Sequence, residues 1–250
     1  MGQLTDATRI RAVVLTTQRT GSTFLIQCLG SHPEIECASE ILIGEPDVPR
    51  PAYRGRFKQL VKVANIVKSG AWRPGNRMSR FYAGGLAKVR IFKAMYNQLA
   101  NPFALRYLRQ HEDVRILHLR RHNLLKVHVS RLLMPKRDRV QATMPVEAVR
   151  IHVDPTQAIA SMRKARLRYQ RFETLFARHQ RLPVTYERLF DGQFLEADTA
   201  MRISDFLGVV QHPMQSSIVK INPESLRDMV TNYDELADAV SRTEFADMLE

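Results

Sequence analysis

The chain has 250 residues, of which 44% are hydrophobic and 25% charged, and its formal net charge is +13. This length and composition are typical of a soluble globular protein, and we expect residues 1–250 to form a single domain. The sequence contains no apolar run near the roughly 20 residues of a membrane span. The N-terminal stretch MGQLTDATRI lacks the apolar centre of a signal peptide, so we expect a cytoplasmic protein. Two cysteines, Cys28 and Cys37, are too few for a disulfide framework.

The positive charge is concentrated in the first half of the chain. Residues 48–111 include fourteen Lys and Arg and no Asp or Glu, whereas residues 187–250 include thirteen acidic and five basic side chains. A basic half favours an anionic ligand or surface, and peripheral contact with an anionic membrane is one candidate. Nucleic acid is not expected as a partner, because helix-turn-helix, zinc-finger and aromatic RNA-binding signatures are absent from the sequence. Individually, many of these side chains are equally explained as solvated surface charges.

The first predicted element is a short buried strand at 12–15. Its residues, AVVL, are apolar and include two β-branched side chains, as in the buried strands of parallel sheets. A polar turn at 16–22 follows, and 23–29 has the pattern of a helix that stops at Gly30. A strand, a Gly-containing turn and a helix favour phosphate binding, because the first N–H groups of a helix lack intrahelical partners and its dipole is positive there.

The turn also contains side chains suited to an anion. Gly21 allows a close backbone approach, Ser22 and Thr23 provide hydroxyl donors, and Arg19 provides a fixed positive charge. The turn differs from the loop of nucleoside triphosphatases, G-x-x-x-x-G-K-[ST], because the first Gly and the Lys are both absent. An ordinary Gly-containing turn between a strand and a helix is the simplest alternative.

Strand and helix patterns alternate along the rest of the chain. We expect strands at 88–93, 114–119 and 183–186, and helices at 57–67, 101–110, 124–133, 156–179, 199–207 and in the acidic tail, 222–250. Residues 69–85 are rich in Gly and Arg and are expected to be irregular, and 134–155 is expected to be a mobile excursion. The alternation predicts a three-layer, P-loop-like α/β fold in which helices flank a central parallel sheet.

A second strand-turn-helix unit is predicted at 114–133, with a polar turn between a buried strand and a helix, as in the first unit. Arg121 follows the strand, and Ser130 lies nine residues further on, within the predicted helix. An Arg as a bidentate donor and a Ser hydroxyl can together bind a second phosphate. Arg120 is the alternative phosphate ligand, and a doubled Arg at a strand end is also common on plain surfaces; the alignment of the strand favours Arg121.

In this order, the two units resemble the sulfotransferases that use 3′-phosphoadenosine 5′-phosphosulfate (PAPS). The segment TQRTGST, 17–23, resembles their 5′-phosphosulfate loop, and LHLRRHNLLKVHVS, 117–130, resembles their 3′-phosphate motif with one extra residue of spacing. Three later segments are also similar: VTYERLF, with Arg188 in place of an aspartate, DFLGV, and VTNYDEL, which resembles bacterial members of the nodulation-sulfotransferase type. The unmatched regions, 48–85 and 134–155, are where we expect acceptor specificity.

The resemblance implies the ligand and the residues that bind it. PAPS would be the sulfuryl donor and adenosine 3′,5′-bisphosphate the product, with no metal, and the acceptor would be a small molecule, carbohydrate or lipid with a free hydroxyl. The 5′-phosphosulfate would be bound by Arg19, Thr20, Gly21, Ser22 and Thr23. Arg121 and Ser130 would bind the 3′-phosphate. Tyr186 would lie near the adenine, although a role in the core is equally open.

The resemblance also implies the catalytic residues. In tyrosylprotein sulfotransferases and some bacterial relatives, the base that takes the acceptor proton is a Glu shortly after the phosphate loop. Glu40, in SHPEIECASEIL, matches this pattern, with Glu34 and Glu36 as alternatives. Lys93 resembles a Lys at a strand end that would assist charge stabilisation, although a solvated Lys is an equal interpretation. Arg19 would stabilise the charge on the leaving oxygen.

Two functions of other classes stay open beside a PAPS-dependent sulfotransferase. An atypical P-loop nucleotide kinase is disfavoured by the missing Lys and Ser/Thr pair of its loop. A basic nucleic-acid- or membrane-binding module with a degenerate nucleotide site would explain the charge without any catalysis. A metal enzyme is not expected, because the sequence shows no His/Cys cluster with ligand spacing.

Overall fold

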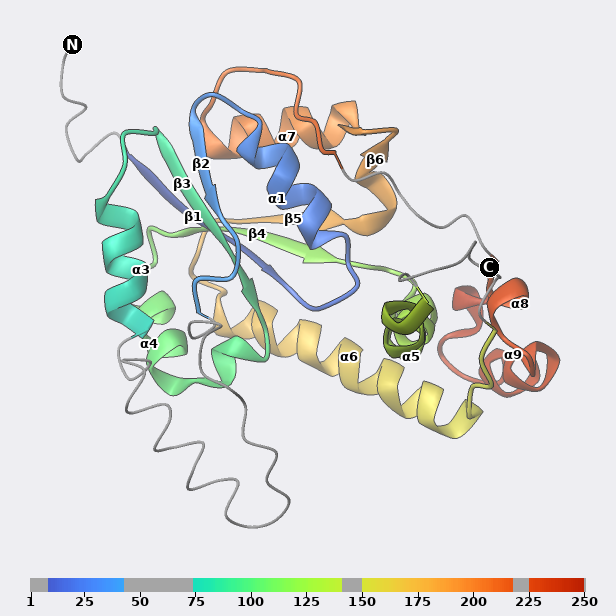
Figure 1. Cartoon of the computed structure of the whole chain (residues 1–250). Coiled ribbons are helices and arrows are strands. Elements are labelled where there is room, and N and C mark those ends of the chain that lie inside the picture. The colour runs from blue at the N-terminus through green and yellow to red at the C-terminus, as the bar shows by residue number, and fades with distance from the viewer. Residues whose placement is uncertain (1–8, 43–73, 141–149, 218–224, 250) are drawn as a thin grey trace.

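The computed structural model describes residues 9–42, 74–140, 150–217 and 225–249. Within these ranges the centre is a parallel sheet of five strands in the order β2-β3-β1-β4-β5 (Figure 1). The strands are β1 (Ile10–Thr16), β2 (Ile35–Ala38), β3 (Val89–Met95), β4 (Arg115–Arg120) and β5 (Arg181–Thr185). The predicted α/β fold with a central parallel sheet is therefore confirmed.

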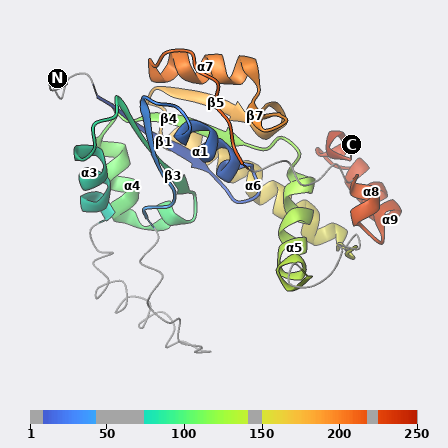
Figure 2. The same cartoon turned by 45° about the horizontal axis from the view of Figure 1, so that its top comes forward.

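Helices cover both faces of the sheet and complete the three layers (Figure 2). One face is covered by α1 (Ser22–Gly30) and α7 (Ala197–Leu207), and the other by α3 (Pro74–Ala83), α4 (Pro102–Gln110) and α6 (Pro155–Leu175). Beyond the carboxyl end of β4 lie α5 (Leu124–Val140), α8 (Leu226–Met229) and α9 (Tyr233–Ser241) (Figure 1). The short elements are the hairpin β6 (Phe190–Asp191) and β7 (Phe194–Leu195) and the 3-10 helices Gln98–Ala100, Tyr186–Arg188 and Ala246–Met248.

The sheet is buried on both faces because alternate residues of its strands face opposite layers. In β1, Ala12 and Val14 pack into the cluster beneath α1 and α7, while Val13 and Leu15 pack into the cluster beneath α4 and α6. None of these four side chains is more than 1% exposed. This two-sided burial explains why the β1 sequence is a continuous apolar run.

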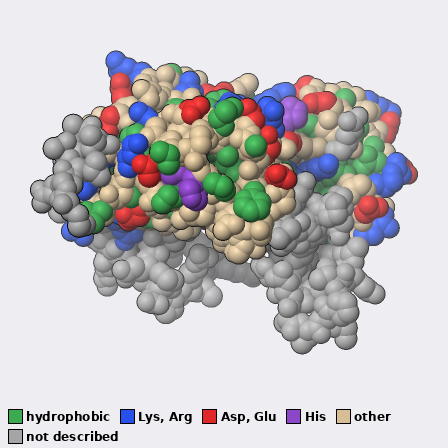
Figure 3. Space-filling view, turned by 90° about the horizontal axis from the view of Figure 1, so that it is seen from above, with side chains coloured by type: hydrophobic (Ala, Val, Ile, Leu, Met, Phe, Trp, Pro, Cys, Tyr) green, Lys and Arg blue, Asp and Glu red, His purple; other side chains and the backbone are tan. Residues whose placement is uncertain are grey.

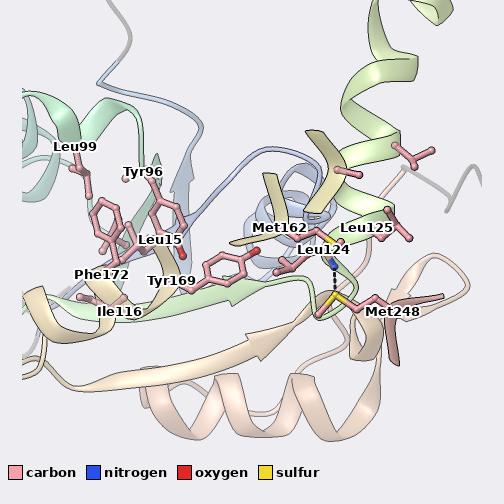
Figure 4. Close-up of a cluster of buried hydrophobic side chains, with 14 of the residues drawn as sticks. Leu15, Tyr96, Leu99, Ile116, Leu124, Leu125, Met162, Tyr169, Phe172 and Met248 are labelled. Carbon is pink, nitrogen blue, oxygen red and sulfur yellow. Dashed lines mark hydrogen bonds between the residues drawn. The ribbon is translucent and has the colours of Figure 1, made fainter. Parts of the chain in front are cut away.

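The second cluster contains an aromatic group close to the carboxyl end of the sheet. The rings of Tyr96, which follows β3, and Phe172, from α6, stack with their centroids 4.3 Å apart, and Tyr169 approaches Tyr96 edge to face (Figure 4). The same view shows Leu124 at the start of α5, whose N–H lies 3.3 Å from the sulfur of Met248. The acidic tail therefore packs against the beginning of α5.

Several helix boundaries follow local signals in the sequence. Asn101 and Asp154 cap α4 and α6 by accepting hydrogen bonds from backbone N–H groups, and each is followed by proline at the first helical position. Gly208, with φ 64°, follows the last residue of α7, so the predicted end of this helix at 207 is confirmed. Among the described residues, no helix is both long and apolar enough to cross a membrane.

Several predicted bounds were wrong. The tail, predicted to be helical over 222–250, is divided in its described part into α8, α9 and the 3-10 helix Ala246–Met248, with turns between them, and the strand predicted at 183–186 is β5 at Arg181–Thr185. Residues 69–85 include α3, which buries Met78 and Tyr82 one helical turn apart. Helix α5 continues past Pro135 to Val140, although an interior proline disfavours a helix; the residues that follow include Lys136, Arg137 and Arg139, which favour one. Strand β3 continues beyond Lys93 to Met95.

The end of α6 was also predicted wrongly. This helix ends at Leu175, and a turn replaces the predicted helix up to His179. His179 is buried, and its Nε2 lies 2.9 Å from the carbonyl oxygen of Leu108, which fixes the turn. The helix predicted at 57–67 lies outside the described residues.

Candidate active site

The loop between β1 and α1 has the backbone of an anion-binding turn. Arg19 and Gly21 both have left-handed conformations, with φ 67° and 75°. Gly21 precedes α1 without a side-chain cap, and the first turn of α1 contains no acidic residue. The first N–H groups of a helix have no intrahelical acceptor, so this end of α1 can donate to a bound anion.

Two buried threonines hold the loop in shape. The hydroxyl oxygens of Thr16 and Thr20 lie 2.6 Å apart, and the Thr20 hydroxyl donates to the carbonyl of Thr17 at 2.8 Å. The Thr16 hydroxyl also lies 2.9 Å from the carbonyl oxygen of Leu119 in β4. The predicted ligand Thr20 therefore has its hydroxyl occupied within the loop. Ser22 is buried at the start of α1, and Thr23 is exposed.

Gly21 is closely packed against a later segment of the chain. A Cβ atom at Gly21 would lie 2.9 Å from Leu189 Cδ1 and 3.0 Å from Tyr186 Cδ2. The sequence predicted that Gly21 allows close approach to a ligand. Here the approach is made by the segment that follows β5, so glycine is needed for packing as well as for its positive φ.

The structure brings the second predicted phosphate motif into contact with this loop. Arg19 Nε donates to the Ser130 hydroxyl of α5 at 2.8 Å, and Arg121 Nη1 donates to the Arg19 carbonyl at 3.4 Å. The Arg121 guanidinium lies 4.1 Å from the centre of the Tyr186 ring. Two arginines and a hydroxyl, from segments about a hundred residues apart, therefore meet at one place.

Arg120 and Arg121 have different partners. Arg120 pairs with Glu173 of α6 at 2.5 Å, whereas Arg121 lies against the loop. Burial lowers the pKa of the Arg121 guanidinium, and the charge of Arg19 acts in the same direction, while Tyr186 and Glu187 oppose it. Of the two arginines, Arg120 is thus committed to an ion pair with α6, whereas Arg121 is the one that contacts the phosphate loop.

The turn that contains Arg121 is fixed by a residue that the sequence did not single out. Glu187 Oε1 accepts hydrogen bonds from the backbone N–H groups of His122 and Asn123, at 2.9 and 3.2 Å. These groups come just before the start of α5, where a carboxylate is favourable. The spacing of the sequence contains no signal for this contact, because Glu187 is 65 residues from His122.

Glu40 and Lys93 form a second group beyond the carboxyl end of β2. Lys93 Nζ lies 3.0 Å from Glu40 Oε1, and the Lys93 side chain is only 5% exposed. Gln98 Nε2 donates to Glu40 Oε2 at 2.5 Å, while Gln98 Oε1 accepts from the N–H of Met95 at 2.9 Å. Lys93 is therefore not a solvated surface lysine, and Gln98 is a neighbour of Glu40 that the sequence did not reveal.

The two alternative glutamates have other partners. Glu36 pairs with Arg90 in register between β2 and β3, and Glu34 Oε2 accepts from the N–H of Val210 at 2.9 Å. Glu34 precedes β2 and Glu36 lies in its first half, whereas Glu40 follows the carboxyl end of this strand. Because the strands are parallel, this is also the end of the sheet at which β1 leads into the phosphate loop.

Comparisons with known proteins add little at this point. No family model matches the chain, and neither does any curated protein. Among solved structures, the chain is similar to a sulfotransferase from Alicyclobacillus acidocaldarius, with 17% sequence identity over 96% of each chain and a TM-score of 0.47. A likeness this distant does not reveal an activity, which has to be inferred from the side chains of the site.

A buried histidine of β4 is unsuited to acid–base work. His118 of β4 lies 2.5 Å from the Tyr96 hydroxyl, and burial, with Arg120 and Arg181 nearby, lowers the pKa of His118 to about 3. It is therefore neutral at physiological pH. In the part of the chain that the structure describes, no group of three or more His, Cys, Asp and Glu side chains could hold a metal ion.

The packing of Gly21 gives a direct test of the loop. In Gly21→Ala, the left-handed conformation should destabilise the fold by roughly 1–2 kcal/mol, and the contacts with Leu189 and Tyr186 should add to this loss. Gly192→Ala is the matched control, because Gly192 also has a positive φ, 58°, but nothing lies within 4 Å of its Cβ position. Denaturant unfolding should show the larger loss for Gly21→Ala, and equal losses would contradict the close packing.

Proposed function

We propose that this chain is a PAPS-dependent sulfotransferase that transfers a sulfuryl group to a hydroxyl of a carbohydrate or glycolipid. The proposal depends chiefly on one observation, the contact of the Arg19 loop with the Arg121 and Ser130 unit. A nucleotide with anionic groups at both its 3′ and 5′ positions requires two neighbouring anion sites. Two strand-turn-helix units that meet at one edge of a parallel sheet provide such a pair.

The residues present fit this nucleotide. The left-handed loop and the uncapped start of α1 suit the 5′-phosphosulfate, with Arg19, Ser22 and Thr23 as further donors. Arg121 and Ser130 suit the 3′-phosphate, because a guanidinium and a hydroxyl donor lie together beside the loop. The ring of Tyr186 packs against the Arg121 guanidinium. We therefore propose that the main role of Tyr186 is to position Arg121, and that contact with the adenine is a secondary role.

We assign the catalytic roles to the charged side chains at this edge of the sheet. Bound PAPS would supply an activated sulfuryl group for in-line attack by the acceptor hydroxyl. Glu40 would accept the hydroxyl proton. Lys93 and Gln98 fix the orientation of its carboxylate, whose two oxygens retain further lone pairs for the acceptor. Arg19 would stabilise the negative charge that develops on the leaving oxygen.

The assignment of Arg121 can be tested by titration with adenosine 3′,5′-bisphosphate in the absence of magnesium. Arg121→Gln should lower the affinity by about 10–100-fold, as expected for a charged hydrogen bond worth about 1.5–3 kcal/mol. Affinity for 5′-AMP, which lacks the 3′-phosphate, should change little. Calorimetry would measure both.

Arg120→Gln is the matched control, because it removes the neighbouring arginine and its pair with Glu173. It should leave the affinity for adenosine 3′,5′-bisphosphate close to that of the wild type. A large loss of affinity in Arg120→Gln alone would show that Arg120, not Arg121, binds the 3′-phosphate.

The wild type also distinguishes the alternative functions. Tighter binding of ATP with magnesium than of adenosine 3′,5′-bisphosphate would support a kinase, and binding of neither nucleotide would support a binding module.

The assignment of Glu40 predicts a loss of turnover without a loss of binding. Glu40→Gln should reduce kcat by about 10²–10⁴-fold, the usual contribution of a general base, while adenosine 3′,5′-bisphosphate binds as before. Glu34→Gln is the control, since Glu34 lies before β2 and should be dispensable for chemistry. Release of adenosine 3′,5′-bisphosphate from PAPS, with acceptors found by screening, would be measured. Wild-type turnover in Glu40→Gln would eliminate Glu40 as the base.

A further inference from the structure

A third group of basic side chains faces the phosphate loop from α5 and α6. Arg131 follows Ser130 on α5, and its Nη2 donates to the Thr17 hydroxyl at 2.9 Å. Two consecutive residues of α5 therefore contact the loop, Ser130 at Arg19 and Arg131 at Thr17, where the loop leaves β1. The two anion sites described above do not require Arg131.

Arg131 is accompanied by two more basic groups. Helix α6 packs against α5, and the charge of Arg168 on α6 lowers the pKa of Arg131, in addition to the larger effect of burial. His128, one helical turn before Arg131, has its pKa lowered by burial and by the charge of Arg131. Tyr169, the neighbour of Arg168, has its hydroxyl 3.5 Å from the backbone nitrogen of Arg121. The group of Arg131, Arg168 and His128 thus lies beside the proposed nucleotide site.

The positive charges of Arg131 and Arg168 are not balanced within the described part of the chain, and His128, whose lowered pKa leaves it neutral at physiological pH, adds a polar imidazole beside them. No ion pair there joins Arg131, Arg168 or His128 to a carboxylate, and Arg131 Nε is buried without a hydrogen-bond partner. The contrast with the preceding turn of α6 is clear, since Arg163 and Arg166 both pair with Glu244, at 3.0 and 2.7 Å. Like charges that are partly removed from water destabilise one another unless an anion lies between them.

We propose that Arg131, Arg168 and His128 form an anion-binding subsite for the acceptor, so that the acceptor bears a carboxylate, sulfate or phosphate group besides its reactive hydroxyl. This inference rests on the proposed sulfotransferase function. The anionic ends of PAPS are already matched by the start of α1 with Arg19 and by Arg121 with Ser130. Arg131 contacts the opposite end of the loop, at Thr17, which favours a different ligand for this third group.

Thermal unfolding with inorganic sulfate tests the subsite while the nucleotide sites are filled. With saturating adenosine 3′,5′-bisphosphate, added sulfate should raise the Tm of the wild type further at constant ionic strength. Arg168→Gln should weaken this response about tenfold in sulfate concentration, as expected for the loss of one charged hydrogen bond. Arg168→Lys, which keeps the charge, should retain most of it. Arg163→Gln, on the exposed and paired part of the same helix, should behave as the wild type.

The outcomes separate the two proposals. No Tm shift with adenosine 3′,5′-bisphosphate alone would reject the sulfotransferase proposal, whatever sulfate does. A normal nucleotide shift followed by the same sulfate response in the wild type and in Arg168→Gln would reject the subsite.

A second experiment tests whether the subsite binds the acceptor, by comparing an acidic saccharide with a matched neutral one as acceptors. The wild type should favour the acidic member, Arg168→Gln should reduce this preference through KM, and a preference for the neutral member would overturn the acceptor assignment.

Discussion

The hydrogen bond between Arg19 and Ser130, 2.8 Å long, joins the two halves of the proposed nucleotide site. It is formed because β1 and β4 are neighbours in a parallel sheet, so the turns that follow them emerge at the same edge. The Thr16 hydroxyl and the Leu119 carbonyl link the same two strands one step before the turns. If β1 and β4 were not paired in this register, the loop at Arg19 and the turn at Arg121 would not meet. Each unit alone would be an ordinary strand-turn-helix.

The edge of the sheet concentrates positive charge at a cost to stability. Arg19, Arg121 and Arg131 converge there, and burial and like charge lower the pKa of the latter two. Tyr186 and Glu187 act against this lowering at Arg121. Elsewhere the charges are mixed: on the face over α1 and α7, basic and acidic side chains are interspersed (Figure 3). The general basicity of the chain is therefore less informative than the placement of these few arginines, which an anionic ligand would stabilise.

Local sequence predicted much of this arrangement because local physics determines it. The apolar run of β1, the glycine turn before α1, and Arg121 with Ser130 are encoded within short segments. The contacts of Glu40 with Lys93 and Gln98 could not be predicted from the sequence, because the burial of Lys93 depends on β2 packing beside β3. The Glu187 contact and the packing of Gly21 against Leu189 likewise need the folded chain. Helix α3 was missed because the burial of Met78 and Tyr82 outweighed the nearby glycines, and α5 was predicted too short because its expected end lay just before Pro135.

The most direct test of the central claim is the thermal stability of the wild-type chain with adenosine 3′,5′-bisphosphate and, separately, with 5′-AMP, both without metal. If the two anion sites act together, the bisphosphate at about a hundred times its dissociation constant should stabilise the fold by roughly 2.7 kcal/mol, a shift of several degrees. At the same concentration 5′-AMP should give a much smaller shift, because it lacks the group that Arg121 and Ser130 would bind. Equal shifts with both nucleotides, or none with the bisphosphate, would contradict the account.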